Sequence, residues 1–234
     1  MYVLNIANKN YSSWSLRPWA LMRERHIAFE ERLHPFNPEG SSFEMFRAFS
    51  PNGMVPCLED GAWKVWDSLG IAEYLAERHA GVWPKDAAAR AWARCAAAEM
   101  HSGFPALREH CSMSVGVRVR LAETSPALTK DLARIDELWS EGLDRWGGPF
   151  LCGETFGAVD AFYAPVAFRV RGYGLALGET AAAYAERLLD LPSMREWEAD
   201  ALAEPWREPA HDAEIAARGA VIEDRRVDPA FATE

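Results

Sequence analysis

The stretch NGMVPCLEDG at residues 52–61, followed by KVWDSLGIAEYL at residues 64–75, decides how this chain folds. It predicts a short apolar strand, a tight turn at Asp60-Gly61 and a second strand. Pro56 stands at the start of the first strand, where a proline removes no hydrogen bond from the sheet. We therefore expect a β-hairpin that leads directly into a helix.

The start of that helix is a candidate binding site. Asp67 and Ser68 fall where unpaired main-chain N–H groups and the positive end of the helix dipole favour an anionic ligand. The Val55-Pro56 bond precedes the first strand, and an X-Pro bond can adopt the cis form. A peptide-like ligand that carries a carboxylate would suit both features.

The residues before this stretch alternate between strand and helix signals. Residues 1–7 and 29–36 predict strands. Helices are predicted from near Trp14, with Pro18 in the first turn, and over residues 43–49. Together with the hairpin and its helix, the order becomes βαβαββα. This order is typical of a thioredoxin-like domain, which we place at residues 1–81.

From residue 86 onward the signals are helical, and we place an all-helical domain at residues 86–234. The predicted helices span residues 87–111 with a kink at Gly103 and Pro105, 124–146, 158–171, 180–189 and 193–202. Residues after about 205 carry mixed charge and little periodicity, which predicts a tail that packs over the surface or stays mobile. The expected fold class is therefore α/β plus all-α.

The ordered motifs resemble the glutathione-binding half of the glutathione S-transferase family. In that family a valine before a cis-proline offers its N–H and C=O to the cysteinyl part of glutathione, which the resemblance transfers to Val55 and Pro56. It likewise implies that Asp67 and Ser68 hold the γ-glutamyl end. Glutathione is then a co-substrate, and no metal is expected.

The serine cluster SSWS at residues 12–15 occupies the place where a thioredoxin-like fold carries its reactive group. No thiol is present there, so the available chemistry is a hydroxyl that donates a hydrogen bond to a bound thiolate. The cluster resembles the bacterial serine-type transferases, such as zeta and theta members. Counting back from Arg17, as their pattern does, selects Ser12 as the catalytic residue, with Ser13 as the close rival.

A second-substrate pocket is expected beside these serines. Trp14 is adjacent to them, and His101 lies on the predicted long helix that faces the cleft between domains. The resemblance implies attack of the glutathione thiolate on a small electrophile, a cytoplasmic homodimer and a role in detoxification. The residues alone do not name the electrophile.

Two alternative functions remain. A glutathione-dependent isomerase similar to maleylacetoacetate isomerase would need a small, basic cleft for a dicarboxylate, which Arg108, Arg118 or Arg120 could supply. A non-catalytic member of the family would bind glutathione for regulation without turning over any electrophile. The intact serine cluster disfavours the non-catalytic alternative.

The composition of the 234-residue chain excludes several classes of partner. Its formal net charge is −10, whereas nucleic acids and anionic membranes require a basic surface. The four cysteines have neither the spacing of a disulfide framework nor that of a metal site. The first seven residues lack the charged start and the apolar run of a signal peptide. We therefore expect a cytoplasmic protein that contacts no membrane and no nucleic acid.

Overall fold

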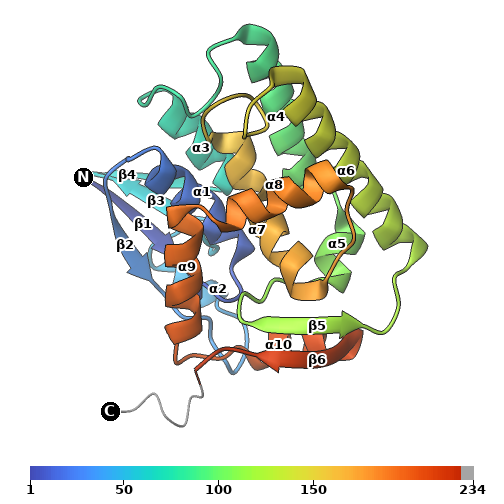
Figure 1. Ribbon diagram of the computed structural model, residues 1–234. Coiled ribbons are helices and arrows are strands. Elements are labelled where there is room, and N and C mark those ends of the chain that lie inside the picture. Colours follow the sequence, from blue (N-terminus) through green and yellow to red (C-terminus); the bar gives the residue numbers. More distant parts are fainter. Residues whose placement is uncertain (228–234) are drawn as a thin grey trace.

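A four-stranded sheet with helices on its faces forms the first part of the chain (Figure 1), of which this computed structural model describes residues 1–227. The strand order is β2-β1-β3-β4, and β1 runs parallel to β2 and antiparallel to β3. The elements are β1 (Tyr2–Ile6), α1 (Ser13–Glu24), β2 (Phe29–Leu33), α2 (Phe43–Arg47), β3 (Cys57–Asp60), β4 (Trp63–Trp66) and α3 (Ser68–Ala76). This βαβαββα order confirms the thioredoxin-like prediction.

The hairpin and the helix start that decide the fold form as the sequence predicts. Gly61 adopts a positive φ of 59° in the turn between β3 and β4, a conformation that glycine adopts without steric penalty. The Val55-Pro56 bond is cis. Asp67 is the N-cap of α3, and its carboxylate accepts hydrogen bonds from the N–H groups of Leu69 and Gly70. The cap therefore satisfies two of the unpaired donors at this helix start.

Helix α1 differs from the prediction at Pro18. The sequence analysis placed this proline in the first turn, but α1 begins at Ser13 and Pro18 lies in its second turn. Because proline has no N–H, the carbonyl of Trp14 loses its helical donor there. Packing outweighs that loss, since Leu16 and Trp19 on either side of the proline are fully buried.

The second part is largely helical, which confirms the predicted fold class. Its helices are α4 (Ala87–Ser102), α5 (Pro105–His110), α6 (Pro126–Trp146), α7 (Ala158–Tyr173), α8 (Glu179–Leu189) and α9 (Pro192–Ala203). Helix α7 lies at the centre and packs against α1, α4 and α8. The predicted kink near residue 103 is instead a break, because Phe104 adopts a left-handed conformation between α4 and α5. Within residues 1–227, no helix combines the length and apolarity that crossing a bilayer requires.

A two-stranded sheet in this part was not predicted. Strand β5 (Val117–Leu121) pairs antiparallel with β6 (Gly219–Asp224), which follows a further helix, α10 (Pro209–Arg218). Residues 209–224 thus form a helix and a strand, where the sequence analysis expected a tail (Figure 1). The last part of the expected tail, residues 228–234, lies outside the described residues. The two strands are separated by almost a hundred residues, so no local hairpin signal announces them.

The start of α7 is anchored by a buried carboxylate. Asp160 is 1% exposed and accepts hydrogen bonds from the N–H groups of Leu151 and Gly157 and from the Tyr184 hydroxyl. Burial raises the pKa of Asp160 to about 6, and these hydrogen bonds act in the opposite direction. Gly157 is the N-cap and has no side chain, so only the Asp160 half of a capping box is present.

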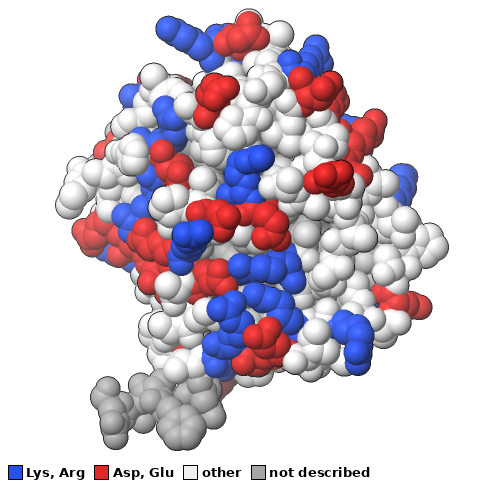
Figure 2. All heavy atoms as spheres, in the orientation of Figure 1, with Lys and Arg blue, Asp and Glu red and all other residues white. Residues whose placement is uncertain are grey.

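Many charged side chains on the surface form ion pairs. Glu198 on α9 forms ion pairs with Arg171 and Arg225, and its Oε1 atom lies 2.7 and 2.9 Å from their guanidinium nitrogens. Figure 2 shows basic and acidic side chains interleaved over the face that carries α9 and the β5–β6 sheet. Exposed pairs of this kind contribute little stability each.

Candidate functional site

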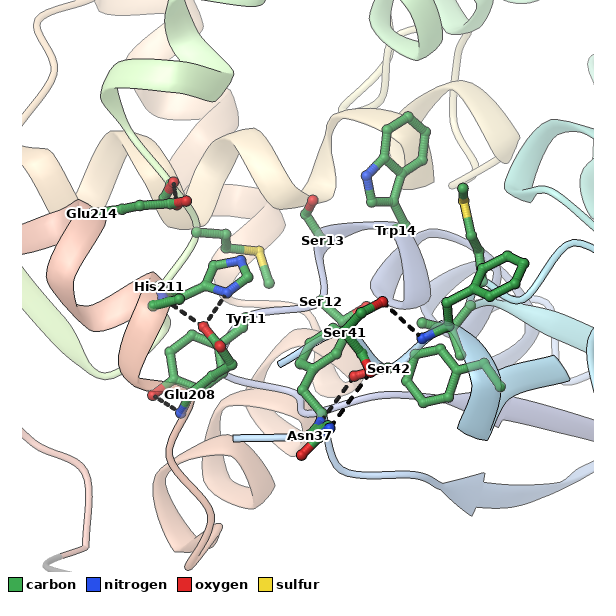
Figure 3. A pocket seen from close by; sticks show the side chains of 18 of the residues that line it. Tyr11, Ser12, Ser13, Trp14, Asn37, Ser41, Ser42, Glu208, His211 and Glu214 are labelled. Carbon is green, nitrogen blue, oxygen red and sulfur yellow. Dashed lines mark hydrogen bonds and ion pairs between the residues drawn. The ribbon is translucent and has the colours of Figure 1, made fainter. Parts of the chain in front are cut away.

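A cavity of about 630 Å³ lies where the thioredoxin-like part, the helical part and α10 meet. This volume is within the roughly 300–1,000 Å³ typical of small-molecule sites. One wall comes from residues 11–14 and 53–55, and from the loop after β2 with Asn37, Ser41 and Ser42 (Figure 3). The other walls come from Arg108 and Met113, from Arg169 on α7, and from Glu208, His211 and Glu214 at α10.

The two candidate serines reach the cavity with different hydrogen bonding. The Ser12 hydroxyl donates to Ser15 Oγ at 2.7 Å and accepts from the Ser15 N–H, so it acts as the N-cap of α1. The side chain of Ser13 points into the cavity (Figure 3), and its hydroxyl has no hydrogen-bond partner within residues 1–227. Of the two, Ser13 carries the hydroxyl that is available to a ligand.

Main-chain groups beside Ser13 are also available. In the described part of the chain, the N–H of Trp14 has no hydrogen-bond partner, as is usual for a residue in the first turn of a helix. Val55 lines the same cavity, and both its N–H and its C=O lack partners among the described residues. A peptide-like ligand could therefore pair with Val55 while a negatively charged atom lies against the start of α1.

The remaining predicted residues lie outside this cavity lining. Pro56 is buried next to Val55. Ser68 is 1% exposed, and its hydroxyl accepts from Arg17 Nη1 at 3.3 Å. The Nε2 atom of His101 lies 3.5 Å from Asp67 Oδ2, and its ring makes an edge contact with Trp14 at 5.3 Å between centroids. The structure thus groups Ser12, Ser13, Trp14 and Val55 at the cavity, with Asp67 and His101 next to one another beyond Trp14.

The wall of the cavity formed by the helical part contains two arginines that the sequence analysis did not associate with each other. Arg108 on α5 donates to the carbonyls of Met100 and Gly103, and Arg169 on α7 donates to the carbonyl of Cys111. Both guanidinium groups line the cavity. Arg169 carried no signal in the sequence, because a single arginine in an apolar helix has no motif around it.

Helix α10 supplies a histidine–carboxylate pair to the same cavity. Glu208 is the N-cap of α10, and its Oε2 lies 2.6 Å from Nδ1 of His211. The His211 ring lies against Tyr11, at 5.4 Å between centroids. These residues were assigned to the tail, and only the sequence Glu208-Pro209, a residue able to cap followed by proline at the first helical position, could have indicated a helix there.

The described residues offer no evident metal site. Across residues 1–227, no group of three or more His, Cys, Asp or Glu side chains converges as ligands of one ion. The cavity lining itself offers hydroxyl and N–H donors, guanidinium groups and the histidine of α10.

Comparison with known proteins identifies the family. The N-terminal domain profile of the glutathione S-transferases matches residues 11–78, and their C-terminal domain profile matches residues 120–201. Together these matches span more than half of the chain. The thioredoxin-like part followed by a helical part is the fold of these enzymes, and the chain belongs to the glutathione S-transferase family.

Individual relatives are more distant. Dichloromethane dehalogenase from Methylorubrum extorquens is 37% identical over 61 residues, which are 26% of this chain and 21% of the dehalogenase. A glutathione transferase homologue from Burkholderia, solved with bound glutathione, superimposes with a TM-score of 0.64 at 21% identity over 86% of this chain and 97% of that one. A theta-class glutathione S-transferase from Xanthomonas axonopodis pv. citri, also with glutathione bound, gives a TM-score of 0.60 at 23% identity over 83% and 95%. The resemblance to zeta and theta classes stays a prediction, because these distant matches establish the fold and not the class.

Proposed function

We propose that this protein is a glutathione transferase that adds the glutathione thiolate to a small electrophile, with Ser13 as the hydroxyl that stabilises the sulfur. One observation carries the proposal: the unpartnered Ser13 hydroxyl faces a cavity that is also lined by the free main-chain groups of Val55. Ser12 then serves as the cap of α1. In the reaction the sulfur forms a bond to the electrophilic carbon, the leaving group departs with its electron pair, and the thiol proton goes to solvent.

The energies suffice for this role. A thiol titrates near pH ~8.5, and lowering its pKa by two units needs about 2.7 kcal/mol in favour of the thiolate. A hydrogen bond to a charged group supplies roughly 1.5–3 kcal/mol. The helix terminus, with the free N–H of Trp14, adds about 0.3–1 kcal/mol. Ser13 and the start of α1 can therefore supply most of the activation.

The rest of the glutathione site follows the family resemblance. Val55 before the cis Pro56 would pair with the cysteinyl part, and Asp67 and Ser68 would hold the γ-glutamyl end. Asp67 Oδ2 contacts only His101 among the described polar groups, which leaves it accessible to an ammonium group. We take residues 1–81 as the glutathione-binding domain and residues 86–234 as the part that shapes the second-substrate pocket, to which Trp14 contributes directly.

Calorimetry of glutathione binding tests the assignment. Titrations in buffers of different ionisation enthalpy measure the protons released on binding. We expect wild type and Ser12→Ala to release a proton near neutral pH, and Ser13→Ala to bind glutathione without that release. Absence of binding at millimolar glutathione would contradict the proposed function, and binding without turnover of any electrophile would support the non-catalytic alternative. Loss of proton release in Ser12→Ala alone would return the role to Ser12.

A glutathione-dependent isomerase remains the second candidate, because one of its three predicted arginines reaches the site. Arg108 lines the cavity. Arg118 on β5 instead donates to the carbonyls of Val115 and Val117, and Arg120 is exposed on the same strand. Conversion of maleylacetoacetate without net consumption of glutathione would favour the isomerase over the transferase.

We also propose a homodimer, as the resemblance implies. Strand β4 lies at the edge of the sheet and exposes two tryptophans, with 72% of Trp63 and 46% of Trp66 accessible. Exposed aromatic side chains of this kind are enriched at protein interfaces. Light scattering coupled to size exclusion would give twice the chain mass, and Trp63→Lys would shift the particle towards the monomer.

A further inference from the structure

Arginines near the surface and arginines in the interior have different partners. Many of the arginines outside the core meet carboxylates, as in the pairs Arg94–Glu73 at 2.9 Å and Arg134–Glu99 at 2.7 Å. A buried charge needs such a partner more than an exposed one, because it has lost its hydration. An interior arginine without a carboxylate therefore indicates a missing anion.

Three arginines are of this kind: the buried Arg17 and Arg169, and the half-buried Arg108. Arg17 is 1% exposed and Arg169 is 5% exposed. None of the three forms a salt bridge with a described acidic residue. Arg108 and Arg169 donate to main-chain carbonyls, whereas Arg17 donates only to Ser68, and its Nε and Nη2 atoms have no partner in residues 1–227.

The three guanidinium groups also repel one another. Burial, followed by the charge of Arg108, lowers the pKa of Arg169 to about 10. Burial, followed by the charges of Arg108 and Arg169, lowers the pKa of Arg17. The interior of a protein with net charge −10 thus holds a cluster of cations that an anion would neutralise.

The cavity gives an anion access to this cluster. Arg108 and Arg169 line it on the wall formed by α5 and α7, whereas the predicted glutathione groups Ser13 and Val55 lie on the wall formed by the thioredoxin-like part. Arg17 and Arg108 both contact the ring of Trp14, with their guanidinium carbons at 4.1 and 5.0 Å from its centroid. An anion that reaches Arg108 from the cavity therefore lies close to the start of α1.

Two carboxylates line the cavity as well, and both are engaged elsewhere. Glu208 contacts His211, and Glu214 accepts a hydrogen bond from the Ser112 hydroxyl at 3.1 Å. Both belong to α10 or its cap, and neither forms an ion pair with Arg108 or Arg169. The acidic groups and the arginines thus occupy different parts of the cavity wall.

We propose that Arg108 and Arg169 bind a carboxylate of the second substrate, so that the preferred electrophile is a small organic acid. This inference rests on the proposed transferase function. The bond changes at the reacting carbon stay those of the transfer described above, and the substrate carboxylate takes no part in them. It holds the electrophilic carbon against the thiolate at the start of α1.

The test uses a matched pair of electrophiles: a chlorodinitrobenzene and the chlorodinitrobenzoate that carries one added carboxylate on the same ring. In both, the sulfur bonds to the ring carbon and chloride leaves. We expect wild type to have a kcat/KM roughly ten-fold to a hundred-fold higher for the benzoate, since hydrogen bonds to a charged group discriminate by about this factor. Arg108→Met should bring the ratio of the two kcat/KM values down towards one, whatever the effect of the substitution on each rate separately.

Controls separate the possible causes. Arg108→Lys keeps the positive charge and should keep part of the preference, and Arg195→Met removes an exposed, paired arginine far from the cavity and should change neither rate. Equal wild-type rates for both compounds would overturn the inference and leave the transferase function intact. That comparison needs no variant to fold.

Two further readouts cover the remaining outcomes. If Arg108→Met loses affinity for glutathione itself, measured by calorimetry, the carboxylate belongs to glutathione and the inference is wrong. If glutathione binds but neither electrophile reacts, calorimetry of benzoate with the glutathione-loaded protein decides: binding that Arg108→Met abolishes supports the site, and no binding refutes it. Absence of both glutathione binding and turnover would contradict the proposed function, and the same benzoate titration on the unloaded protein still tests the arginines.

Discussion

The first turns of α1 and α7 are both capped by a side chain, but they differ in whether polar groups remain free to bind a ligand. At α7 the carboxylate of Asp160 is buried, and every hydrogen bond it accepts comes from within the fold. At α1 Ser12 satisfies the cap, but the neighbouring Ser13 hydroxyl and the Trp14 N–H face a cavity without described partners. A helix start whose polar groups are all hydrogen-bonded within the fold contributes stability. A helix start with free polar groups next to a cavity is available for binding a ligand.

The interior arginines extend this comparison. Buried polar groups in folded proteins are almost always hydrogen-bonded, so the exceptions call for an explanation. The unpartnered atoms of Arg17 and the free groups at the start of α1 occur in the same region, since Arg17 contacts the ring of Trp14. We expect substitution of groups that are hydrogen-bonded within the fold to lower stability, and substitution of the free groups at the cavity to lower activity.

The largest effect is expected at the start of α7. Asp160→Ala leaves the buried N–H groups of Leu151 and Gly157 and the Tyr184 hydroxyl without an acceptor, and it should lower the free energy of unfolding by about 4 kcal/mol. Urea denaturation measures this loss. The folded fraction should bind glutathione with wild-type affinity, and a loss below about 1 kcal/mol would show that the network is not an anchor.

The next effect concerns the loop that leads into α1. Glu204 is 5% exposed, and its carboxylate accepts from the N–H groups of Lys9 and Asn10. Burial raises the pKa of Glu204 from 4.5 to about 7. The folded state therefore holds a proton that the unfolded state releases between these pH values, so this group stabilises the fold fully below pH 4.5 and loses that contribution as the pH rises to about 7.

The magnitude of that change follows from the pKa difference, and is up to about 3 kcal/mol for this group. Denaturation curves between pH 5 and about 8, compared with those of Glu204→Gln, isolate it from other titrating groups. We expect the wild-type stability to fall relative to the variant as the pH rises through this window. Parallel curves would mean that Glu204 titrates normally.

A smaller free-energy change, with activity as its readout, is expected at Ser13. Ser13→Ala removes the hydroxyl that faces the cavity and should lower kcat/KM by roughly ten-fold to a hundred-fold, equivalent to about 1.5–3 kcal/mol of thiolate stabilisation. Its melting temperature should stay at the wild-type value. A destabilised variant with unchanged kcat/KM would reverse the comparison at α1.

The smallest effect is expected at Ser12. Ser12→Ala removes the cap of α1 and should lower the free energy of unfolding by about 1 kcal/mol, the usual cost of losing a serine cap. Its kcat/KM should fall far less than that of Ser13→Ala. Thermal denaturation and steady-state rates on the two variants, measured side by side, are the most direct control for the assignment of the serines.

Most of the thioredoxin-like part could be predicted from the sequence. Residues 52–75 predicted the hairpin and the helix start correctly, because turns and caps are determined by a few adjacent residues. They allowed a cis Val55-Pro56 bond, which the family resemblance implied and the structure contains. It also located SSWS at the start of α1. It left Ser12 and Ser13 unresolved, since a cap residue and a ligand-facing residue can both be serine, and only the hydrogen bonds of the folded chain distinguish them.

Less of the helical part could be predicted, because more of it depends on contacts between segments that are distant in the sequence. The sequence predicted its main helices, but β5 pairs with a strand almost a hundred residues later, and α10 forms the cavity wall from a segment expected to be a tail. Arg108 and Arg169 lie on separate helices and acquire a common role only where those helices pack. Local patterns determine helices, turns and caps because those interactions are short in sequence. The cavity, its unpaired arginines and its available serine exist only after distant segments meet, and burial then leaves some polar groups without partners.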